Sequence, residues 1–387
     1  MINPYDFVND TVKNIPPSGI RKFFDLVSQT EGVISLGVGE PDFVTPWHIR
    51  EACFYSLEQG YTTYTSNLGL PELRKAVNKY LNKYHLEYNP ETEILITVGV
   101  SEAVDIALRA LVAPGEEVLI PDPCYVSYAP MTTLAGGVPV EIPTFEKDEF
   151  KLTAVEIEKL ITPRSKVLIL TFPNNPTGAV MSKEDLEKLS ELVHKHNLVV
   201  ISDEIYCELT YEGAHTSFAA LPGMAERTIV LNGFSKAFAM TGWRVGYAAG
   251  AKEIIGAMMK IHQFSMLCAP IMSQKAALEA LTNGQSEMQK MVYSYNQRRH
   301  LIVNGLREIG LKCFEPRGSF YAFPSIQNTG MSSDDFAEKL LQAEKVAVVP
   351  GNAFGKSGEG FIRCCYAASV PQINEALERM KRFVGSL

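Results

Sequence analysis

The stretch TIVLNGFSKAFAMTGWRVG, residues 228–246, joins an apolar run to a turn of small residues that carries one lysine, Lys236. Residues 228–232 read as a buried strand, so Lys236 stands at a strand end, where α/β folds hold their ligands. Arg244 follows eight positions later. Burial and a nearby cation both lower the pKa of an amine and make it a nucleophile near neutral pH. The stretch therefore predicts an α/β fold with a reactive lysine, against the alternative of a solvated loop lysine.

Length and composition favour a large folded protein of two domains. The 387 residues exceed the roughly 250–300 at which a single core stops growing. A net charge of −8 without a basic stripe argues against nucleic acid and anionic membrane surfaces as partners. No apolar run is long enough to span a bilayer, and the N-terminus lacks a signal pattern. Seven cysteines without a CxxC spacing indicate reduced thiols, so we expect a cytoplasmic protein.

Apolar runs alternate with amphipathic stretches through the middle of the chain. Strands are expected at 94–99, 117–122, 166–172, 198–204, 228–232 and 245–250, and helices at 101–112 and 182–197. This alternation predicts a mostly parallel sheet covered by helices on both faces. A long helix at about 286–310, short strands in SFYAF, VAVV and FIRCCY, and helices at 333–343 and 371–384 indicate a second, smaller α/β domain from about residue 285.

The segment ILITVGVSEAVDIALRALV, residues 94–112, reads as strand, glycine and helix. The free amide N–H groups of a helix N-terminus form a ready anion site, although an ordinary turn between strand and helix is the alternative. Glu102 suits the helix dipole but would repel a phosphate unless its side chain points away.

Two charged residues stand in apolar surroundings. Asp203 directly follows the apolar run LVVIS, where a carboxylate needs a cationic partner, unless it only caps a helix. Arg363 lies inside the apolar strand FIRCCY, and its planar fork suits a carboxylate.

The turn around Lys236 resembles, position by position, the lysine signature of class I and II pyridoxal-phosphate aminotransferases: Gly233, Phe234, Ser235, Lys236, Gly242, Arg244, Val245 and Gly246 fit it. The resemblance runs from about residue 18 to 385. It implies a fold-type-I enzyme with a mostly parallel seven-stranded sheet. The large cofactor-binding domain would span 46–284, and the small domain 1–45 and 285–387.

The resemblance also implies a role for each matching residue. Lys236 is the catalytic residue that forms a Schiff base with pyridoxal phosphate and moves the proton. Asp203 pairs with the pyridine nitrogen, and Tyr125 stacks on the ring. The other implied contacts are Val100, Ser101, Ser235 and Arg244 for the phosphate, Asn175 and Tyr206 for the phenolate oxygen, Gly39, Asn175 and Arg363 for the substrate carboxylate, and Tyr64 for the phosphate of a neighbouring subunit in a homodimer. No metal is expected, and Asp122–Pro123 and Asn175–Pro176 are candidate cis bonds.

The implied activity is a ping-pong transfer of the amino group of an L-amino acid, aromatic, aspartate or related, to a 2-oxo acid such as 2-oxoglutarate. No residue clearly matches the distal-carboxylate arginine of classical aspartate enzymes; Arg21, in SGIRKFF, is a weak candidate. SGIRKFFDLV and VVPGNAFGKSGEGFIR resemble a subgroup that includes acetyl-diaminopimelate aminotransferases. That activity and a β-lyase remain alternatives. A transcription regulator would need an added DNA-binding domain, and the enzyme motifs here begin by about residue 35.

Overall fold

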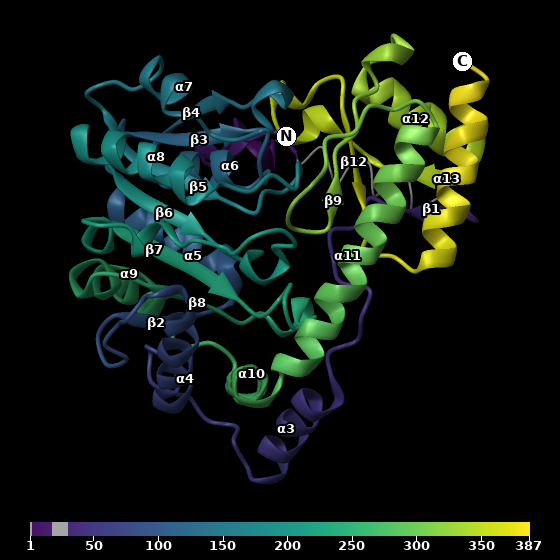
Figure 1. Cartoon of the computed structure of the whole chain (residues 1–387). Helices are drawn as coiled ribbons and strands as arrows, with labels where there is room; N and C mark the ends of the chain where they lie inside the picture. Colours follow the sequence, from purple (N-terminus) through teal and green to yellow (C-terminus); the bar gives the residue numbers. More distant parts are fainter. Residues whose placement is uncertain (1, 18–29) are drawn as a thin grey trace.

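The computed structural model describes residues 2–17 and 30–387 (Figure 1). Its central feature is a seven-stranded sheet in the order β2-β8-β7-β6-β5-β3-β4. Only β8 runs antiparallel to its neighbours, so the mostly parallel sheet is confirmed. The strands are β2 Ile94–Thr97, β3 Glu117–Asp122, β4 Val138–Pro143, β5 Ser165–Thr171, β6 Val199–Asp203, β7 Thr228–Gly233 and β8 Gly246–Ala249.

Both faces of this sheet are buried, which is why its strands read as continuous apolar runs. Along β5, Leu168 and Leu170 pack on the side of α8, whereas Val167 and Ile169 pack on the side of α5 and α9. This alternation is the two-residue period of a strand. The helices of this part are α3 Trp47–Glu58, α4 Pro71–Leu81, α5 Gly99–Leu111, α6 Tyr128–Leu134, α7 Ala154–Glu158, α8 Lys183–Lys195, α9 Lys252–Ser265 and α10 Ile271–Asn283.

The C-terminal part forms a smaller α/β unit. Strands β9 Tyr321–Ala322, β12 Ile362–Cys365 and β11 Val349–Pro350 form an antiparallel sheet. The helices α11 Gln285–Glu308, α12 Ser333–Glu344 and α13 Val370–Gly385 surround it, and α11 runs between the two parts (Figure 1). Near the N-terminus, the short helix α1 is Asp10–Lys13, and β1 Ile34–Ser35 pairs in parallel with β10 Val346–Ala347. This pairing brings residues 34 and 35 to the C-terminal unit, whereas α1 contacts α6 of the larger part.

Two local features differ from the sequence predictions. Strand β4 was not predicted, because its residues VPVEIP carry two prolines and only one of the six residues, Ile142, is fully buried. Prolines are tolerated there because β4 is the edge strand of the sheet. Helix α5 begins at Gly99 instead of residue 101, directly after β2.

Both predicted cis peptide bonds, Asp122–Pro123 and Asn175–Pro176, are present, and Phe172–Pro173 is a third. The seven cysteines are all free. In the described part of the chain, no helix is both long and apolar enough to cross a membrane.

The antiparallel β8 brings several strand ends to one edge of the sheet. Gly233 at the end of β7 pairs with Gly246 at the start of β8, so residues 234–245 leave and re-enter the sheet at the carboxyl edge. Gly246 also pairs with Thr97 at the end of β2, which places the start of α5 beside it. A side chain has no room here: a Cβ on Gly246 would lie 2.9 Å from the Val100 nitrogen.

Gly246→Ala is therefore expected to push the first turn of α5 away from β8. Overpacking of this kind costs about 1–3 kcal/mol of unfolding free energy. Urea unfolding monitored by circular dichroism measures the loss. The matched control is Gly256→Ala in α9, where an added Cβ meets nothing within 4 Å and alanine favours the helix. Equal stability of the two variants would contradict the tight contact at Gly246.

Candidate active site

A cavity of about 720 Å³ opens at the carboxyl edge of the large sheet, next to the small antiparallel sheet. Its lining contains all but one of the residues that the sequence singled out: Gly39, Val100, Ser101, Tyr125, Asn175, Asp203, Tyr206, Ser235, Lys236, Arg244 and Arg363. The exception is Tyr64, which lies outside the cavity with 80% of its surface exposed. Arg21 lies outside the described residues. Residues up to 324 positions apart, Gly39 and Arg363, thus meet in one site.

Lys236 reaches into this cavity just beyond the end of β7. Its Nζ donates a hydrogen bond to the Gly39 carbonyl at 2.7 Å and lies 5.9 Å from the centre of the Tyr206 ring. Burial is the main cause that lowers the pKa of Lys236 to about 8. The Arg363 and Arg244 guanidiniums lower it further, whereas the Glu40 carboxylate raises it. An amine with this pKa is neutral in a substantial fraction of molecules near neutral pH, so it can act as a nucleophile or a base.

Asp203 ends β6 and is buried without a cationic side chain beside it. Its carboxylate accepts hydrogen bonds from the Tyr128 hydroxyl at 2.7 Å and from the Ile205 amide at 3.2 Å. No lysine, arginine or histidine of the described residues forms an ion pair with it. Burial raises the pKa of Asp203 to about 6. A ligand with a positively charged ring nitrogen would supply the missing partner.

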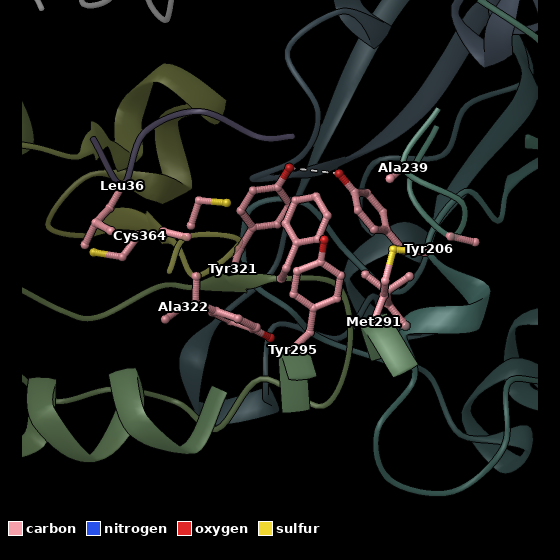
Figure 2. Packing of buried hydrophobic residues seen from close by; sticks show 14 of the residues in the cluster. Leu36, Tyr206, Ala239, Met291, Tyr295, Tyr321, Ala322 and Cys364 are labelled. Carbon is pink, nitrogen blue, oxygen red and sulfur yellow. Dashed lines mark hydrogen bonds between the residues drawn. The ribbon is translucent and has the colours of Figure 1, made fainter. Parts of the chain in front are cut away.

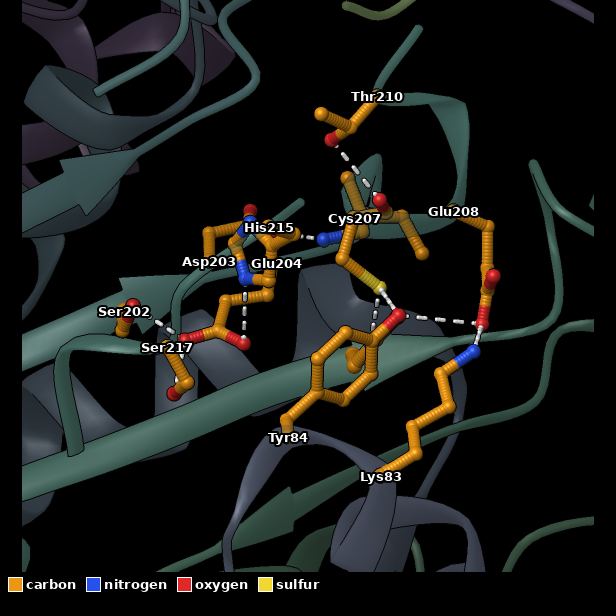
Figure 3. Close-up of polar contacts among 12 residues, drawn as sticks. Lys83, Tyr84, Ser202, Asp203, Glu204, Cys207, Glu208, Thr210, His215 and Ser217 are labelled. Atoms are coloured by element: carbon orange, nitrogen blue, oxygen red, sulfur yellow. Dashed lines mark hydrogen bonds and ion pairs between the residues drawn. The ribbon is translucent and has the colours of Figure 1, made fainter. Parts of the chain in front are cut away.

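The next residue, Glu204, anchors the end of this strand from behind. Its carboxylate accepts hydrogen bonds from the Ser202 hydroxyl at 2.9 Å and the Ser217 hydroxyl at 2.6 Å, and it contacts the His215 Nε2 at 3.0 Å (Figure 3). Glu204 is 1% exposed. Several donors to one buried carboxylate fix its position, so the backbone that carries Asp203 is held rigidly.

The first turn of α5 also contributes to the lining of the cavity. Val100 and Ser101 lie in this turn, and Ser235 and Arg244 line the cavity beside it. Arg244 has a left-handed backbone, with φ of 50°. Its guanidinium lies so close to Gly99 that a Cβ on that residue would be 2.7 Å from Nη2. Free amide groups, hydroxyls and a guanidinium together suit a phosphate.

Glu102 does not interfere with this anion site. Its Oε1 contacts the Nδ1 of the buried His262 at 2.6 Å, and its Oε2 accepts a hydrogen bond from the Val98 amide. The Glu102 carboxylate therefore contacts α9 and the residue that precedes α5.

Arg363, on β12, is buried and points into the cavity from the small sheet. Its Nη1 donates to the Asn175 Oδ1 at 2.9 Å and its Nη2 to the Gly37 carbonyl at 2.6 Å. Its Nε has no hydrogen-bond partner within the described ranges 2–17 and 30–387. A buried guanidinium with neutral partners and a free donor suits an anionic ligand such as a carboxylate.

Two tyrosines of the site were missed by the sequence reasoning. Tyr128 holds Asp203, and Tyr321 on β9 contacts the Tyr206 hydroxyl at 2.8 Å (Figure 2). Both stand in segments whose apolar pattern reads as core, and both are in fact buried. For Tyr128 the available signal was its spacing of three from Tyr125 in DPCYVSY, which puts both rings on one side of a turn. Tyr321 carried no such signal.

Together these groups define the kind of cofactor that fits. Asp203 offers an anion to a ring cation, the start of α5 offers donors to a phosphate, and Tyr125 contributes an aromatic ring to the same lining. Lys236 offers an amine to a carbonyl group. A flat cationic heterocycle with a phosphate and an aldehyde satisfies all four.

Comparison with known proteins agrees with this geometry. Residues 31–380 match the family model "Aminotransferase class I and II". The chain is 58% identical to "Putative aminotransferase YugH" of Bacillus subtilis, over 98% of each chain. It is 46% identical to an aspartate aminotransferase of Pyrococcus abyssi, over 97% of each. The solved structure of an aromatic aminotransferase from Pyrococcus horikoshii superposes with a TM-score of 0.90 at 46% identity, covering 94% of this chain and 99% of that one. The seven-stranded sheet, the lysine at its edge and these matches establish that the chain belongs to the class I and II aminotransferases.

Proposed function

We propose that this aminotransferase binds pyridoxal phosphate in the cavity at the carboxyl edge of the large sheet and transfers amino groups from L-amino acids to 2-oxo acids. Class I and II aminotransferases depend on this cofactor as a family. The observation that carries the proposal is that one cavity contains both an unpaired carboxylate and an amine of lowered pKa. A buried carboxylate, Asp203, lacks a cation, and a lysine with a lowered pKa, Lys236, lies near it.

The residues of the cavity divide between cofactor and substrate. Asp203 would face the pyridine nitrogen, Tyr125 the ring, and Asn175 and Tyr206 the ring oxygen. The phosphate would lie against Val100, Ser101, Ser235 and Arg244, with Tyr64 of a second subunit. Lys236 would hold the carbonyl carbon. When bound, the cofactor would supply an electron sink for the charge that develops at the substrate Cα.

The remaining groups would hold and deprotonate the substrate. Arg363 and Asn175, with the amide of Gly39, would bind the α-carboxylate, and this orients the Cα hydrogen. The free amine of Lys236 would take the proton from the substrate Cα and deliver it to the cofactor C4′, acting as a general base and then as a general acid. Its pKa of about 8 suits both directions of this transfer near neutral pH.

We propose aromatic amino acids as the preferred donors and 2-oxoglutarate as an acceptor. In the described part of the chain, the cations that line the cavity are Lys236, Arg244 and Arg363, all assigned to other groups. A distal carboxylate would find no dedicated partner there, whereas Tyr125 and Val38 offer a ring and apolar surface. The relatives named above include both an aspartate and an aromatic aminotransferase. Acetyl-diaminopimelate as a substrate and β-elimination are the alternatives.

We also propose a homodimer with shared active sites. Several large apolar side chains are exposed on three segments beside α10: Trp47, Phe54 and Tyr55 on α3, Tyr61 and Tyr64 in the following loop, and Phe264 at the end of α9. The loop and the end of α9 are tied together, since the Asn67 Nδ2 donates to the Leu267 carbonyl at 2.6 Å. Exposed apolar surface of this extent is typical of a protein interface.

The domain division that we propose places residues 46–284 in the large domain, and 1–45 with 285–387 in the small one. The pairing of β1 with β10 supports it for residues 34 and 35, whereas α1 contacts α6 of the large domain. The seven free thiols support a reducing compartment, and we propose the cytoplasm.

Lys236→Ala is expected to lower transamination by at least about 10²–10⁴-fold, the contribution of a general acid and base. Wild-type protein reconstituted with pyridoxal phosphate should absorb in the visible range through its covalent link to Lys236, and the variant should lose that link. Mass spectrometry after borohydride reduction would locate the attachment. Lys260→Ala, an exposed lysine of α9, is the control and should behave as wild type. Normal turnover in Lys236→Ala would exclude the proposed role.

Asp203→Asn should stabilise the cofactor-free protein while weakening cofactor binding. A carboxylate whose folded-state pKa is raised from 3.8 to about 6 costs up to about 3 kcal/mol when ionised at pH 7, and this cost disappears as the pH falls through 6 toward 4. The neutral amide avoids the cost. Urea unfolding without cofactor should therefore show the variant more stable at pH 7, with a smaller difference at pH 5.

With pyridoxal phosphate bound, wild type should become more stable than Asp203→Asn. Because the cofactor pairs with the wild-type carboxylate, it should stabilise wild type by more than Asp203→Asn. Equal stabilisation of both proteins would show that Asp203 does not face the ring nitrogen.

Donor preference is tested by half-reactions of single amino acids with the cofactor-loaded protein in stopped flow. Phenylalanine and tyrosine should react with a higher kcat/KM than aspartate, because their rings find apolar surface and the aspartate side chain finds no free cation. Product analysis separates transamination from β-elimination, which would release ammonia and pyruvate. A strict preference for aspartate would reveal a cation that the described residues do not include.

The dimer is tested by light scattering and by Phe264→Asp. A charge on this 88%-exposed ring should disrupt an apolar interface and lower activity together with mass, because each site would lose the partner's Tyr64. The control is Val155→Asp, a charge at a 66%-exposed position of α7, which should change neither the mass nor the activity. An active monomer would contradict shared sites.

A further inference from the structure

The Arg363 guanidinium lies close to two aromatic rings. Its central carbon lies 4.4 Å from the centre of the Tyr321 ring and 4.6 Å from that of Phe354. Tyr321 is itself fixed by its hydroxyl contact with Tyr206 (Figure 2). Two rings this close to a guanidinium restrict its orientation. The orientation of Arg363 therefore depends on what fixes Phe354.

Phe354 comes from the loop 351–358, which begins where β11 ends. Across the antiparallel pair of β11 and β12, Val349 lies opposite Arg363. The loop then crosses to the large sheet. The Phe354 carbonyl accepts a hydrogen bond from the Cys124 amide at 3.0 Å, and the Oδ2 of Asp122 accepts two from Ser357, from its amide at 3.0 Å and its hydroxyl at 2.8 Å. These contacts join the loop to the end of β3.

The contact between this loop and Asp122 leaves no free space. Gly355 has φ of 132°, and a Cβ there would lie 1.6 Å from the Asp122 Oδ1. Asp122 is 5% exposed, and its Oδ1 has no hydrogen-bond partner among the residues that the structure describes. A buried carboxylate without a cation is costly, and neither cofactor nor substrate contacts in our proposal use it. Its one visible task is to hold Ser357.

We propose that Asp122 and Ser357 form a latch that positions Phe354, and through it the Arg363 guanidinium, for binding of the substrate carboxylate. The inference rests on the proposed function, since it concerns the residue assigned there to the α-carboxylate. Ser357 and Asp122 touch neither substrate nor cofactor in this assignment; they are positioning residues. The latch spans the two parts of the chain, because Asp122 ends a strand of the large sheet and Phe354 packs on the small one.

The test compares Ser357→Ala, Ser357→Thr, Phe354→Leu and the double variant Ser357→Ala with Phe354→Leu. Ser357→Ala removes the hydroxyl and leaves the amide bond, so the loop should stay folded but loosen. The KM for every amino donor should rise about tenfold, equivalent to about 1.4 kcal/mol of binding, while kcat changes less. Ser357→Thr keeps the hydroxyl and should restore the wild-type KM.

The double variant tests whether the serine acts through the ring. If it does, the double variant should have the KM of Phe354→Leu alone, because the serine has nothing left to position. Ser182→Ala is the matched control: this hydroxyl also contacts an aspartate, Asp185 at 2.9 Å, but at the start of α8, away from Arg363. It should lower stability without changing KM.

A second readout needs no turnover. Calorimetric titration of the holoenzyme with 3-phenylpropanoate, a carboxylate without an amino group, should show about tenfold weaker binding in Ser357→Ala. The affinity for pyridoxal phosphate should stay that of wild type, because the latch lies at the carboxylate end of the cavity.

Three results would overturn the latch. They are an unchanged KM and 3-phenylpropanoate affinity in Ser357→Ala, additive effects in the double variant, or a loss confined to cofactor affinity. Failure of the proposed function would look different: wild type itself would then neither bind pyridoxal phosphate nor transaminate.

Discussion

The site is organised around a carboxylate that the protein does not neutralise by itself. Asp203 is buried at the end of β6 with a tyrosine hydroxyl and an amide as its donors. Burial raises its pKa and lowers that of Lys236, so both shifts oppose the charged forms of the two groups. A protein selected only for stability would pair the two or replace them with apolar residues. Here Lys236 donates to the Gly39 carbonyl instead, and Asp203 is left for a cation from outside. The folded chain is thus poised for a ligand that carries positive charge at one end.

Contacts elsewhere in the fold fix the positions of these two groups. The Glu204 cluster fixes the strand end that carries Asp203, while the close approach of Gly233 and Gly246 fixes the loop that carries Lys236. The carboxylate end of the cavity depends on the second sheet, since Arg363 lies on β12. Its bond to Asn175 crosses from the small sheet to the turn after β5. Neither part of the chain therefore contains all the residues that line the cavity.

Much of this could be predicted from the sequence, because buried parallel strands leave continuous apolar runs and polar residues stand out against them. Asp203, Lys236 and Arg363 were recognisable as charges at the ends or in the middle of such runs. The edge strand β4 was missed because exposure and two prolines remove that signal. Tyr128 and Tyr321 were missed for the opposite reason: an aromatic ring in an apolar segment looks like core, and only the three-dimensional structure shows where its hydroxyl points. The direction of Glu102 likewise depends on His262, 160 residues away. The role of each residue toward a ligand stays a prediction, as does that of Tyr64.

The distribution of cations in the cavity also bears on how selective this enzyme is. Among the described residues of the lining, the cations are Arg244, Arg363 and Lys236. In our proposal they face the phosphate, the substrate carboxylate and the reacting carbonyl group. Each is assigned to a group that every amino acid or the cofactor shares, so none distinguishes one side chain from another. Discrimination then falls to rings and apolar surface, where one methylene more or less changes specificity by only about 1–3 kcal/mol. A site that rejects wrong substrates strongly needs buried polar groups that would be left unpaired. The Nε of Arg363 has no hydrogen-bond partner among the described residues, but in our proposal this group would bind the carboxylate and not the side chain. Under the proposed assignment, the enzyme would recognise the amino acid backbone strictly and accept a range of apolar side chains.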